Sequence, residues 1–402
     1  MGHLTGRVRS WSGAGTWRWL ALALPLCAAL LAAAGVASHY KQADLFCFLS
    51  AGQLIVEGRD PYEATSTSIG QDGIVRTAFC PGRFGYPYWT ALVLAPFAIL
   101  PTPVAALMWE LIAIVSACAG SFLCWRAAGG SARDAPLFVL LVAASEPFWA
   151  TVAKGQFGGL LLGCVGVIAY EVARARERFA GVALVGLALK PHIAPAFALV
   201  ALWSLVSRRR YVVVLSGVAI GGALVAVSLL LDPRWVGVYL GGPGDERANM
   251  FEHLASLWGI AEALGMPILA APLAIAILLP LVIAIASRRL LRTDVLAIGL
   301  ASWMVLTPYA GSSDQLVLVL PWAILCIRWP WATVALALVL PWLLNPLDPA
   351  QLMKVPALIE PGRWNVLVPI ATSVGLGYLL VRSRQPSRMR ASGRLAPPTV
   401  SP

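Results

Sequence analysis

The sequence predicts an all-α, multi-pass integral membrane protein with about 12 transmembrane helices, for three reasons. Of the 402 residues, 59% are hydrophobic and only 12% are charged, against about 25% charged in an ordinary soluble domain. The apolar residues fall in blocks of about 15 to 25, and about 20 helical residues cross a bilayer core. A water-soluble chain of this length could not hide so much apolar surface in one core.

Basic residues lie in short segments beside these apolar blocks. The net charge of +11 comes largely from clusters at Arg7/Arg9, Arg174–Arg178, Arg208–Arg210, Arg288–Arg292 and the tail after Arg382. Placing every cluster on the cytoplasmic side gives a consistent alternation of spans, with most acids outside and both termini inside. The basic balance therefore indicates membrane topology and argues against nucleic-acid binding.

The first expected span covers residues 17–38, and a long outer loop over 39–85 follows it with juxtamembrane helices. The start of the chain resembles a secretory signal peptide, but the length of its apolar run and the polytopic remainder favour a retained span. Residues 86–126 divide at Pro96 and Pro101–Pro103 into a short membrane-dipping piece and a span over 103–126. Two full spans in this region are the alternative, and they would invert everything downstream.

The later spans alternate from there to the end of the membrane domain. They are expected at 136–150, 157–172, 179–190, 191–206, 211–231, 266–286, 295–309, 315–328, 330–344 and 364–382. Pro191 separates two of them, which are short for spans. The sequence thus predicts one membrane domain over 1–382, without internal repeats, and a disordered basic cytoplasmic tail over 383–402.

The cysteines and acids indicate no metal site. Five cysteines lie in apolar blocks, where cysteine behaves as a small hydrophobe: Cys27, Cys118, Cys124, Cys164 and Cys326. Cys47 and Cys80 share the first outer loop, where an oxidising compartment allows a disulfide, and the spacing leaves their pairing open. Outer-loop acids, Asp60, Asp72 and Asp245, could meet a divalent metal, but no spacing announces one. We therefore expect no cofactor.

Unusual polar residues collect on the outer side of this topology. They are Asp44 after the first span, Tyr86, Gln156, Lys190 and His192 at outer turns, and His253 and Asp314 in later loops. Ionisable groups at a membrane boundary cost free energy, so they favour a functional interpretation. Convergence from six loops predicts one site on the face away from the cytoplasm.

The run from Asp44 to Tyr62, ending in Gly58-Arg59-Asp60-Pro61-Tyr62, resembles the first outer loop of glycosyltransferase family 87. The likeness continues through Tyr86-Pro87, Pro96-Phe97, Gly155-Gln156, Lys190-Pro191 and Thr307-Pro308, and so spans most of the chain. Three positions depart from the family pattern: Tyr88 where a second proline is common, His192 where glutamine is common, and Asp314 near a common histidine.

The resemblance implies a GT-C fold and a glycosyltransferase of the bacterial cell envelope. Such an enzyme moves a sugar, most often mannose, from a polyprenyl-phosphate donor to a glycolipid or glycan acceptor at the outer face of the cell membrane. Asp44 would be the general base of an inverting displacement. Lys190 and His192 would supply positive charge to the departing phosphate, and Gln156, Tyr86, His253, Asp314 and Tyr62 would contact substrates.

Other interpretations of the same residues stay open on sequence grounds. Asp44 and Asp314 suit helix caps, Lys190 suits a snorkelling position, and Tyr62 suits loop packing. A transporter or lipid flippase would place polar residues near the midplane and often carries repeats with broken helices. A non-catalytic membrane scaffold would account for the departures from the family pattern.

Overall fold

The computed structural model describes residues 44–62, 68–69, 75–77, 84–175, 178–241, 256–276, 279, 292–307, 310–344 and 361–382. The expected first span at 17–38, the tail over 383–402 and His253 lie outside these ranges. The regular elements of the described residues are helices apart from one short pair of strands, which agrees with the predicted all-α class.

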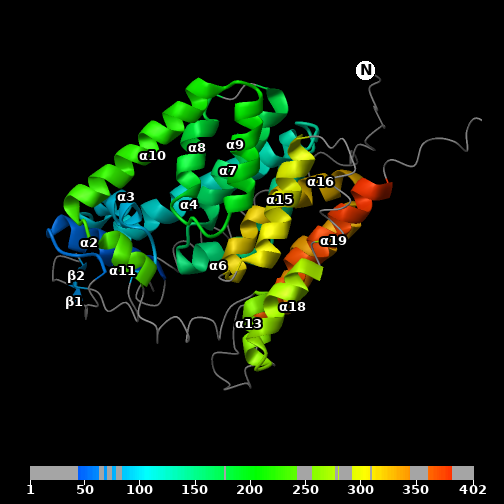
Figure 1. Cartoon of the computed structure of the whole chain (residues 1–402). Helices are drawn as coiled ribbons and strands as arrows, with labels where there is room; N and C mark the ends of the chain where they lie inside the picture. The colour runs from blue at the N-terminus through cyan, green and yellow to red at the C-terminus, as the bar shows by residue number, and fades with distance from the viewer. Residues whose placement is uncertain are drawn as a thin grey trace, which may run out of the picture.

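The segment 39–85, expected as the first outer loop, holds a helix that the sequence predicts and a strand pair that it does not. Helix α2 covers Asp44–Val56, and strands β1 (Ser68–Ile69) and β2 (Val75–Thr77) pair antiparallel. Helix α3, Tyr88–Ala98, packs against α2 so closely that a Cβ on Gly52 would lie 2.9 Å from the Leu94 backbone. The two short helices form one compact unit at one end of the molecule (Figure 1).

Helix α4, Thr102–Ala127, is the long span expected in the 86–126 region. Helix α3 has 11 residues and rises only about 17 Å, too little to cross a bilayer. The region thus holds a short apolar piece followed by one long helix. Helix α7, Gly158–Arg174, packs along α4, and their backbones meet where a Cβ on Gly166 would lie 2.6 Å from the Gly120 carbonyl oxygen.

The span expected over 136–150 is not one continuous helix. The segment forms two helices, α5 (Ala135–Ala143) and α6 (Glu146–Lys154), which meet at an angle of 60°. Pro147 is the physical reason, because it has no amide hydrogen to continue the hydrogen bonding of α5. Ser145 takes extended backbone angles between the two helices, and its hydroxyl donates to the Val142 carbonyl oxygen at 2.6 Å.

Four helices follow α7 in the chain, and the first of them, α8, packs against α7. They are α8 (Ala180–Leu187), α9 (Pro195–Ser207), α10 (Tyr211–Leu231) and α11 (Trp235–Gly241). The break between α8 and α9 covers residues 188–194, so it is wider than Pro191 alone requires. Helix α10 has the bounds expected for its span and leans away from the bundle (Figure 1).

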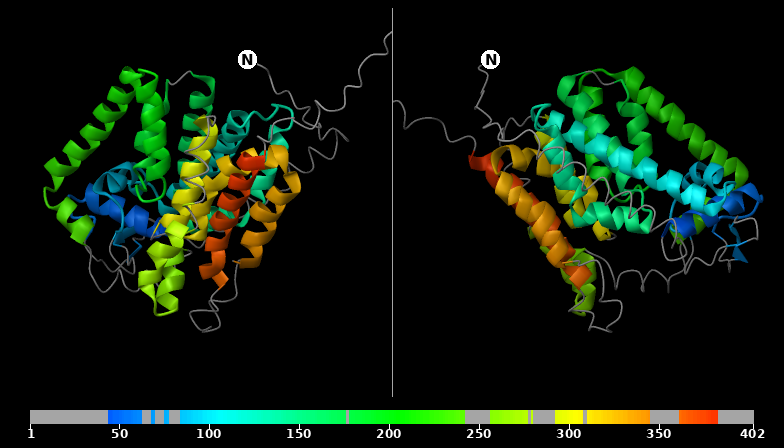
Figure 2. Two further views of the ribbon diagram at one scale, coloured as in Figure 1. Left: turned by 45° about the vertical axis from the view of Figure 1, so that its right-hand side comes forward. Right: turned by 180° about the vertical axis from the view of Figure 1, so that it is seen from behind.

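The C-terminal half adds a layer of helices beside α7. Its elements are α13 (Leu257–Ala263), η2 (Pro267–Leu269), α15 (Arg292–Leu306), η3 (Ser312–Leu318), α16 (Val319–Arg328), α17 (Pro330–Val334), the π segment η4 (Ala335–Val339), α18 (Leu340–Leu344), η6 (Pro361–Val366) and α19 (Leu367–Arg382). Figure 2 shows α15, α16 and α19 side by side.

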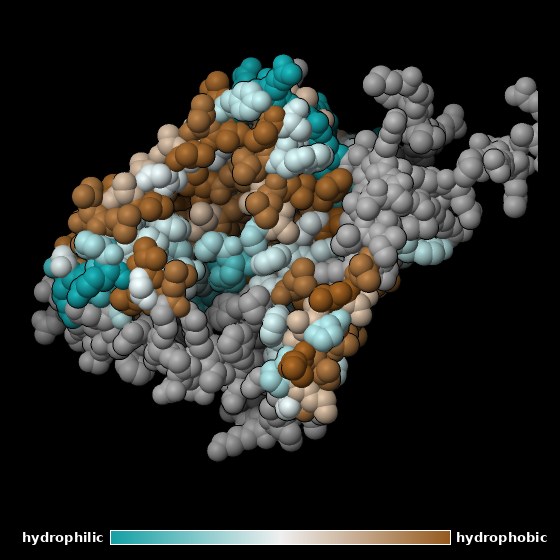
Figure 3. All heavy atoms as spheres, viewed as in Figure 1, coloured by the Kyte–Doolittle hydropathy of each residue, from teal (hydrophilic) through white to brown (hydrophobic). Residues whose placement is uncertain are grey.

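Two of the described helices, α4 and α10, are long and apolar enough to cross a membrane. The bent pair α5 and α6 would add a third span if the two helices cross together. Figure 3 shows hydrophobic residues over the face of α10 that this view presents. Large apolar side chains such as Val212, Leu215 and Leu230 are exposed there, as expected of a surface that lipid covers. The total of 12 spans stays a prediction.

Candidate active site

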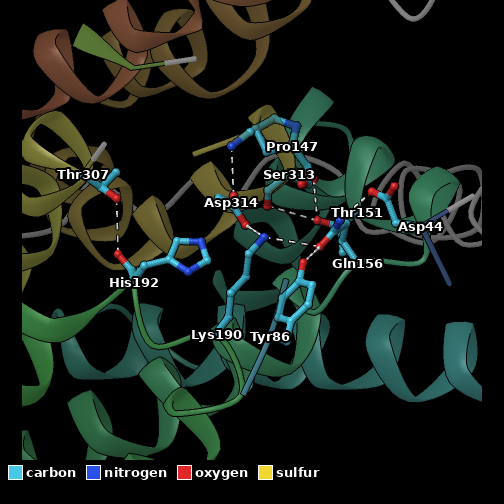
Figure 4. Close-up of polar contacts among 11 residues, drawn as sticks. Asp44, Tyr86, Pro147, Thr151, Gln156, Lys190, His192, Thr307, Ser313 and Asp314 are labelled. Atoms are coloured by element: carbon cyan, nitrogen blue, oxygen red, sulfur yellow. Dashed lines mark hydrogen bonds and ion pairs between the residues drawn. The ribbon is translucent and has the colours of Figure 1, made fainter. Parts of the chain in front are cut away.

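Four polar side chains from distant parts of the chain form a continuous hydrogen-bonded row (Figure 4). The Gln156 amide nitrogen donates to Asp44 Oδ2 at 2.5 Å. Lys190 Nζ donates to Gln156 Oε1 at 3.3 Å and to Asp314 Oδ1 at 2.5 Å. The structure thus brings together four of the residues that the sequence singles out, and we name this row the Asp44–Asp314 network.

Asp44 stands at the exposed end of the network. It lies in the first turn of α2, whose next residues Leu45 and Phe48 are buried and anchor the helix. An acid at a helix start is favourable electrostatically, so the helix-cap interpretation and a functional one are compatible. The Asp44 carboxylate is the accessible acid of the network, because Asp314 is buried.

Gln156 is held in place by a left-handed turn at the end of α6. Gly155 has a φ of +65° and closes the helix. Its carbonyl oxygen accepts from the Trp109 indole nitrogen at 2.8 Å, which ties the turn to α4. A Cβ on Gly155 would meet Leu45 and would lie 3.1 Å from Glu110 Oε1, so only glycine fits between α2 and α4.

Glu110 is a buried carboxyl group directly beneath this turn. It is fully buried, and neither side-chain oxygen has a hydrogen-bond partner within the described part of the chain. Glu110 lies next to Trp109 in α4 and is the one acid of that apolar helix. The structure puts Glu110 against the site.

The Tyr86 side chain packs against the network at Gln156 and Lys190. Its hydroxyl donates to Gln156 Oε1 at 3.4 Å, and its ring lies 5.9 Å from Lys190 Nζ. The ring packs against Phe48 and Phe157 at 5.1 and 5.4 Å between centroids. Burial, followed by the nearby carboxylates, raises the pKa of Tyr86 well above its ordinary value, so it acts as a neutral donor.

Tyr62 supports Tyr86 from the first outer loop. Its hydroxyl donates to the Tyr86 carbonyl oxygen at 3.0 Å, and the side chain is buried. Burial raises the pKa of Tyr62 far above its ordinary value. Tyr62 therefore touches the network through Tyr86.

Lys190 and Asp314 form a buried ion pair. Their side chains are both 2% exposed, and Asp314 Oδ2 also accepts from the Gly311 amide at 2.9 Å at the start of η3. Asp314 therefore caps a helix and binds the lysine at the same time. Thr151 adds a second link to η3, since its hydroxyl lies 3.2 Å from the Ser313 carbonyl oxygen, and no sequence pattern identified it.

His192 lies beside the ion pair and is held by its backbone. Its carbonyl oxygen accepts from the Trp303 indole nitrogen at 2.7 Å and the Thr307 hydroxyl at 3.3 Å. Burial and then the Lys190 charge lower the pKa of His192 to about 4, with Asp314 acting in the opposite direction. This low pKa favours the neutral imidazole at pH 7, and the role expected of His192 stays a prediction.

A sequence model of glycosyltransferase family 87 matches residues 84–321, which is more than half of the chain. The chain belongs to glycosyltransferase family 87. No curated protein and no solved structure matches it. Membership indicates glycosyltransferase activity, and it favours the enzyme over the transporter and scaffold interpretations.

The family 87 match includes most of the predicted site residues. Tyr86, Gln156, Lys190, His192, His253 and Asp314 lie inside it, whereas Asp44 and Tyr62 precede it. The first-loop residues therefore rest on their own likeness to the family pattern and on the contacts of Asp44 with Gln156 and of Tyr62 with Tyr86.

The Asp44–Asp314 network has more acidic than basic groups, so an anionic ligand would need further positive charge beside it. The network has carboxylates at Asp44 and Asp314 and one ammonium group at Lys190, so its formal charge is negative. Lys154, exposed in the last turn of α6, lies two residues before Gln156 and offers a further cation. Within the described ranges, no three His, Cys, Asp or Glu side chains lie close enough together to hold a metal ion.

Cys47 lies one helical turn after Asp44 and is disulfide-bonded. Its expected partner, Cys80, lies outside the described residues. Disulfides persist in oxidising compartments and are rare in the cytosol. The four cysteines that the structure describes as free are Cys118, Cys124, Cys164 and Cys326.

Proposed function

We propose that this enzyme transfers mannose from a polyprenyl-phosphate donor to a glycolipid or glycan acceptor at the extracytoplasmic face of the membrane. One observation supports this most strongly: the exposed Asp44 carboxylate is joined through Gln156 to the buried Lys190–Asp314 pair. In this proposal the polar row has an accessible base at one end and a cation further along it.

Asp44 is the base in this proposal. The acceptor oxygen attacks the anomeric carbon, the bond to the phosphate oxygen breaks with its electron pair, and the acceptor proton passes to Asp44. A single displacement of this kind inverts the anomeric centre. Gln156 holds one carboxylate oxygen, which orients Asp44 and leaves the other oxygen for the acceptor.

The leaving phosphate requires positive charge and hydrogen-bond donors. Lys190 has three ammonium protons, two of which Asp314 and Gln156 engage. Lys154 is exposed nearby and serves as a second cation. The Tyr86 hydroxyl donates to Gln156 and so helps to position the network. In this scheme His192 offers a neutral imidazole for a hydroxyl of the sugar.

The membrane character of the chain favours a lipid-borne donor. A polyprenyl tail stays in the bilayer, so the enzyme must meet its donor there, and α4 and α10 suit a position in the bilayer. The disulfide at Cys47, close in sequence to Asp44, favours an oxidising compartment and hence the outer face.

Donor screening tests this proposal. Purified protein in lipid nanodiscs is given a membrane glycolipid extract and labelled mannose, carried either on polyprenyl phosphate or on a nucleotide. We expect label in the glycolipid fraction only with the polyprenyl-phosphate donor. Transfer from the nucleotide sugar alone would contradict the proposal.

A further inference from the structure

A second cluster of aromatic and acidic side chains lies where α10 ends and α11 begins. Asp232 follows the last residue of α10, and Trp235 is the first residue of α11. The Trp235 ring lies 5.2 Å from Trp89 of α3 and 6.2 Å from Tyr239 of α11 between centroids. We name Asp232, Trp235, Trp89 and Tyr239 the α11 cluster.

Two polar groups of the α11 cluster are almost buried and unused. Asp232 is 7% exposed and Trp235 is 5% exposed. Asp232 Oδ2 and the Trp235 indole nitrogen have no hydrogen-bond partner among the residues described, although Asp232 Oδ1 accepts from the Arg234 amide at 3.0 Å. Buried polar groups are nearly always hydrogen-bonded, so a donor and an acceptor left without partners three residues apart point to a missing ligand.

The α11 cluster is linked to the Asp44–Asp314 network through two short backbone segments. The Trp89 indole nitrogen donates at 3.0 Å to the carbonyl oxygen of Ala188, two residues before Lys190. Three residues before Trp89, Tyr86 has its hydroxyl within the network. Figure 1 shows α11 next to α3, and Figure 3 shows hydrophilic residues in a hollow between α11 and α6.

We propose that the α11 cluster is a saccharide-binding subsite, and that it holds the sugar of the acceptor; the second part rests on the proposed function. Aromatic rings pack against the C–H faces of sugars, and a few polar groups fix the hydroxyls of a ligand. Trp235 supplies an N–H donor and Asp232 a carboxylate acceptor, as two neighbouring sugar hydroxyls require.

Charge distinguishes the two substrates. Asp232 Oδ1 is paired with Arg234 Nε at 3.4 Å, so the α11 cluster has no formal net charge and suits the neutral sugar of the acceptor, whereas the lysines offer positive charge to the phosphate of the donor. A sugar bound at the α11 cluster would sit beside Trp89, whose indole bonds to Ala188, two residues before Lys190. Tyr86, which contacts the network, is three residues before Trp89.

Sugar binding without any donor tests the subsite. Saturation-transfer NMR on the full-length protein in nanodiscs measures binding of methyl α-D-mannopyranoside and methyl α-D-glucopyranoside. We compare Trp235→Phe, which keeps most of the ring and removes the N–H, and Asp232→Asn with two controls. The controls are Trp331→Phe, an exposed tryptophan, and Asp134→Asn, a buried acid beyond the far end of α4.

We expect at least one glycoside to bind the wild-type protein, with the dissociation constant raised fivefold or more in both α11 variants and unchanged in both controls. Thermal midpoints are recorded for each variant, so that a folding defect is recognised. Absence of binding to wild type, or equal binding by folded α11 variants, would overturn the subsite. Failure of sugar transfer with sugar binding intact would instead reject the proposed function.

Discussion

Lys190 and Asp314 carry opposite charges that the protein has removed almost completely from water. Desolvating two ions is expensive, and their attraction offsets this cost only while both are present. We expect Lys190→Met or Asp314→Leu alone to lower the free energy of unfolding by about 3–5 kcal/mol. The double variant Lys190→Met/Asp314→Leu should recover most of that loss and still lack transfer activity.

Chemical denaturation of the four proteins measures this double-mutant cycle. The exposed pair Arg59–Glu57, at 3.4 Å, is the matched control, and Glu57→Gln should change stability by about 1 kcal/mol or less. Two single losses that simply add in the double variant would show that the pair is not coupled.

His192 makes a separate prediction about pH. Its pKa of about 4 lies below the ordinary value of 6.5, so the folded state favours the neutral imidazole. The stability that this neutral state contributes is complete above about pH 6.5 and is lost as the pH falls towards 4. We expect the thermal midpoint of unfolding to decrease as the pH is lowered from 6.5 to 4. The decrease should be less steep in His192→Gln.

His192→Gln removes the titrating imidazole and little else. The contacts with Trp303 and Thr307 use the backbone carbonyl of residue 192 and survive in the variant. Thermal unfolding at several pH values checks the slope. Identical slopes in the two proteins would show that another group is responsible.

At the scale of elements, the left-handed turn at Gly155 connects α2, α4 and α6. A non-glycine residue at positive φ costs about 1–2 kcal/mol, and a Cβ here would also press on Leu45 and Glu110. We expect Gly155→Ala to lower the free energy of unfolding by that backbone cost plus about 1–3 kcal/mol for overpacking. The variant should also transfer less sugar, because Gln156 is displaced.

Gly58→Ala is the control, since Gly58 has nearly the same φ, +70°, and no atoms within 4 Å of an added Cβ. It should show the backbone cost alone. Thermal unfolding and transfer assays compare the two. Equal effects would mean that the packing around Gly155 does not matter.

Some elements were predictable because their ends are marked locally. Helix α10 begins after Arg208–Arg210 and ends before Asp232, so its bounds follow from the sequence. The break between α5 and α6 was missed because the apolar composition of 136–150 outweighed the single Pro147. The strand pair β1–β2 has only two and three residues, too few for a periodic pattern.

The members of the Asp44–Asp314 network could be picked out in the sequence, and their contacts could not. Asp44, Gln156, Lys190 and Asp314 stand out as polar residues beside apolar blocks. The pairing of Lys190 with Asp314 joins residues 124 positions apart, which no local pattern encodes. Glu110 was visible too, but its position under Gly155 depends on how α4 packs against α6.

At the scale of the whole molecule, the account requires one orientation in the membrane. Helix α10 is about 31 Å long, enough to cross the bilayer core, with Arg209 at one end and Arg234 at the other. Both arginines are exposed. The positive-inside rule puts the Arg208–Arg210 cluster in the cytoplasm and therefore Arg234, with the α11 cluster, outside.

Labelling of introduced cysteines checks this orientation. A membrane-impermeant maleimide added to intact cells should label Arg234→Cys at once and Arg209→Cys only after permeabilisation, with the unmodified protein as the background. The reverse pattern would put the site on the cytoplasmic side.

The most direct measurement is mannose transfer from a polyprenyl-phosphate donor by purified wild-type protein and by Asp44→Asn. Asparagine keeps an oxygen for Gln156 and cannot take the acceptor proton, so the variant should stay folded in the membrane. We predict that wild type transfers the sugar and that the variant loses at least about 100-fold in rate, the usual worth of a general base. Near-normal transfer by the folded variant would contradict the account.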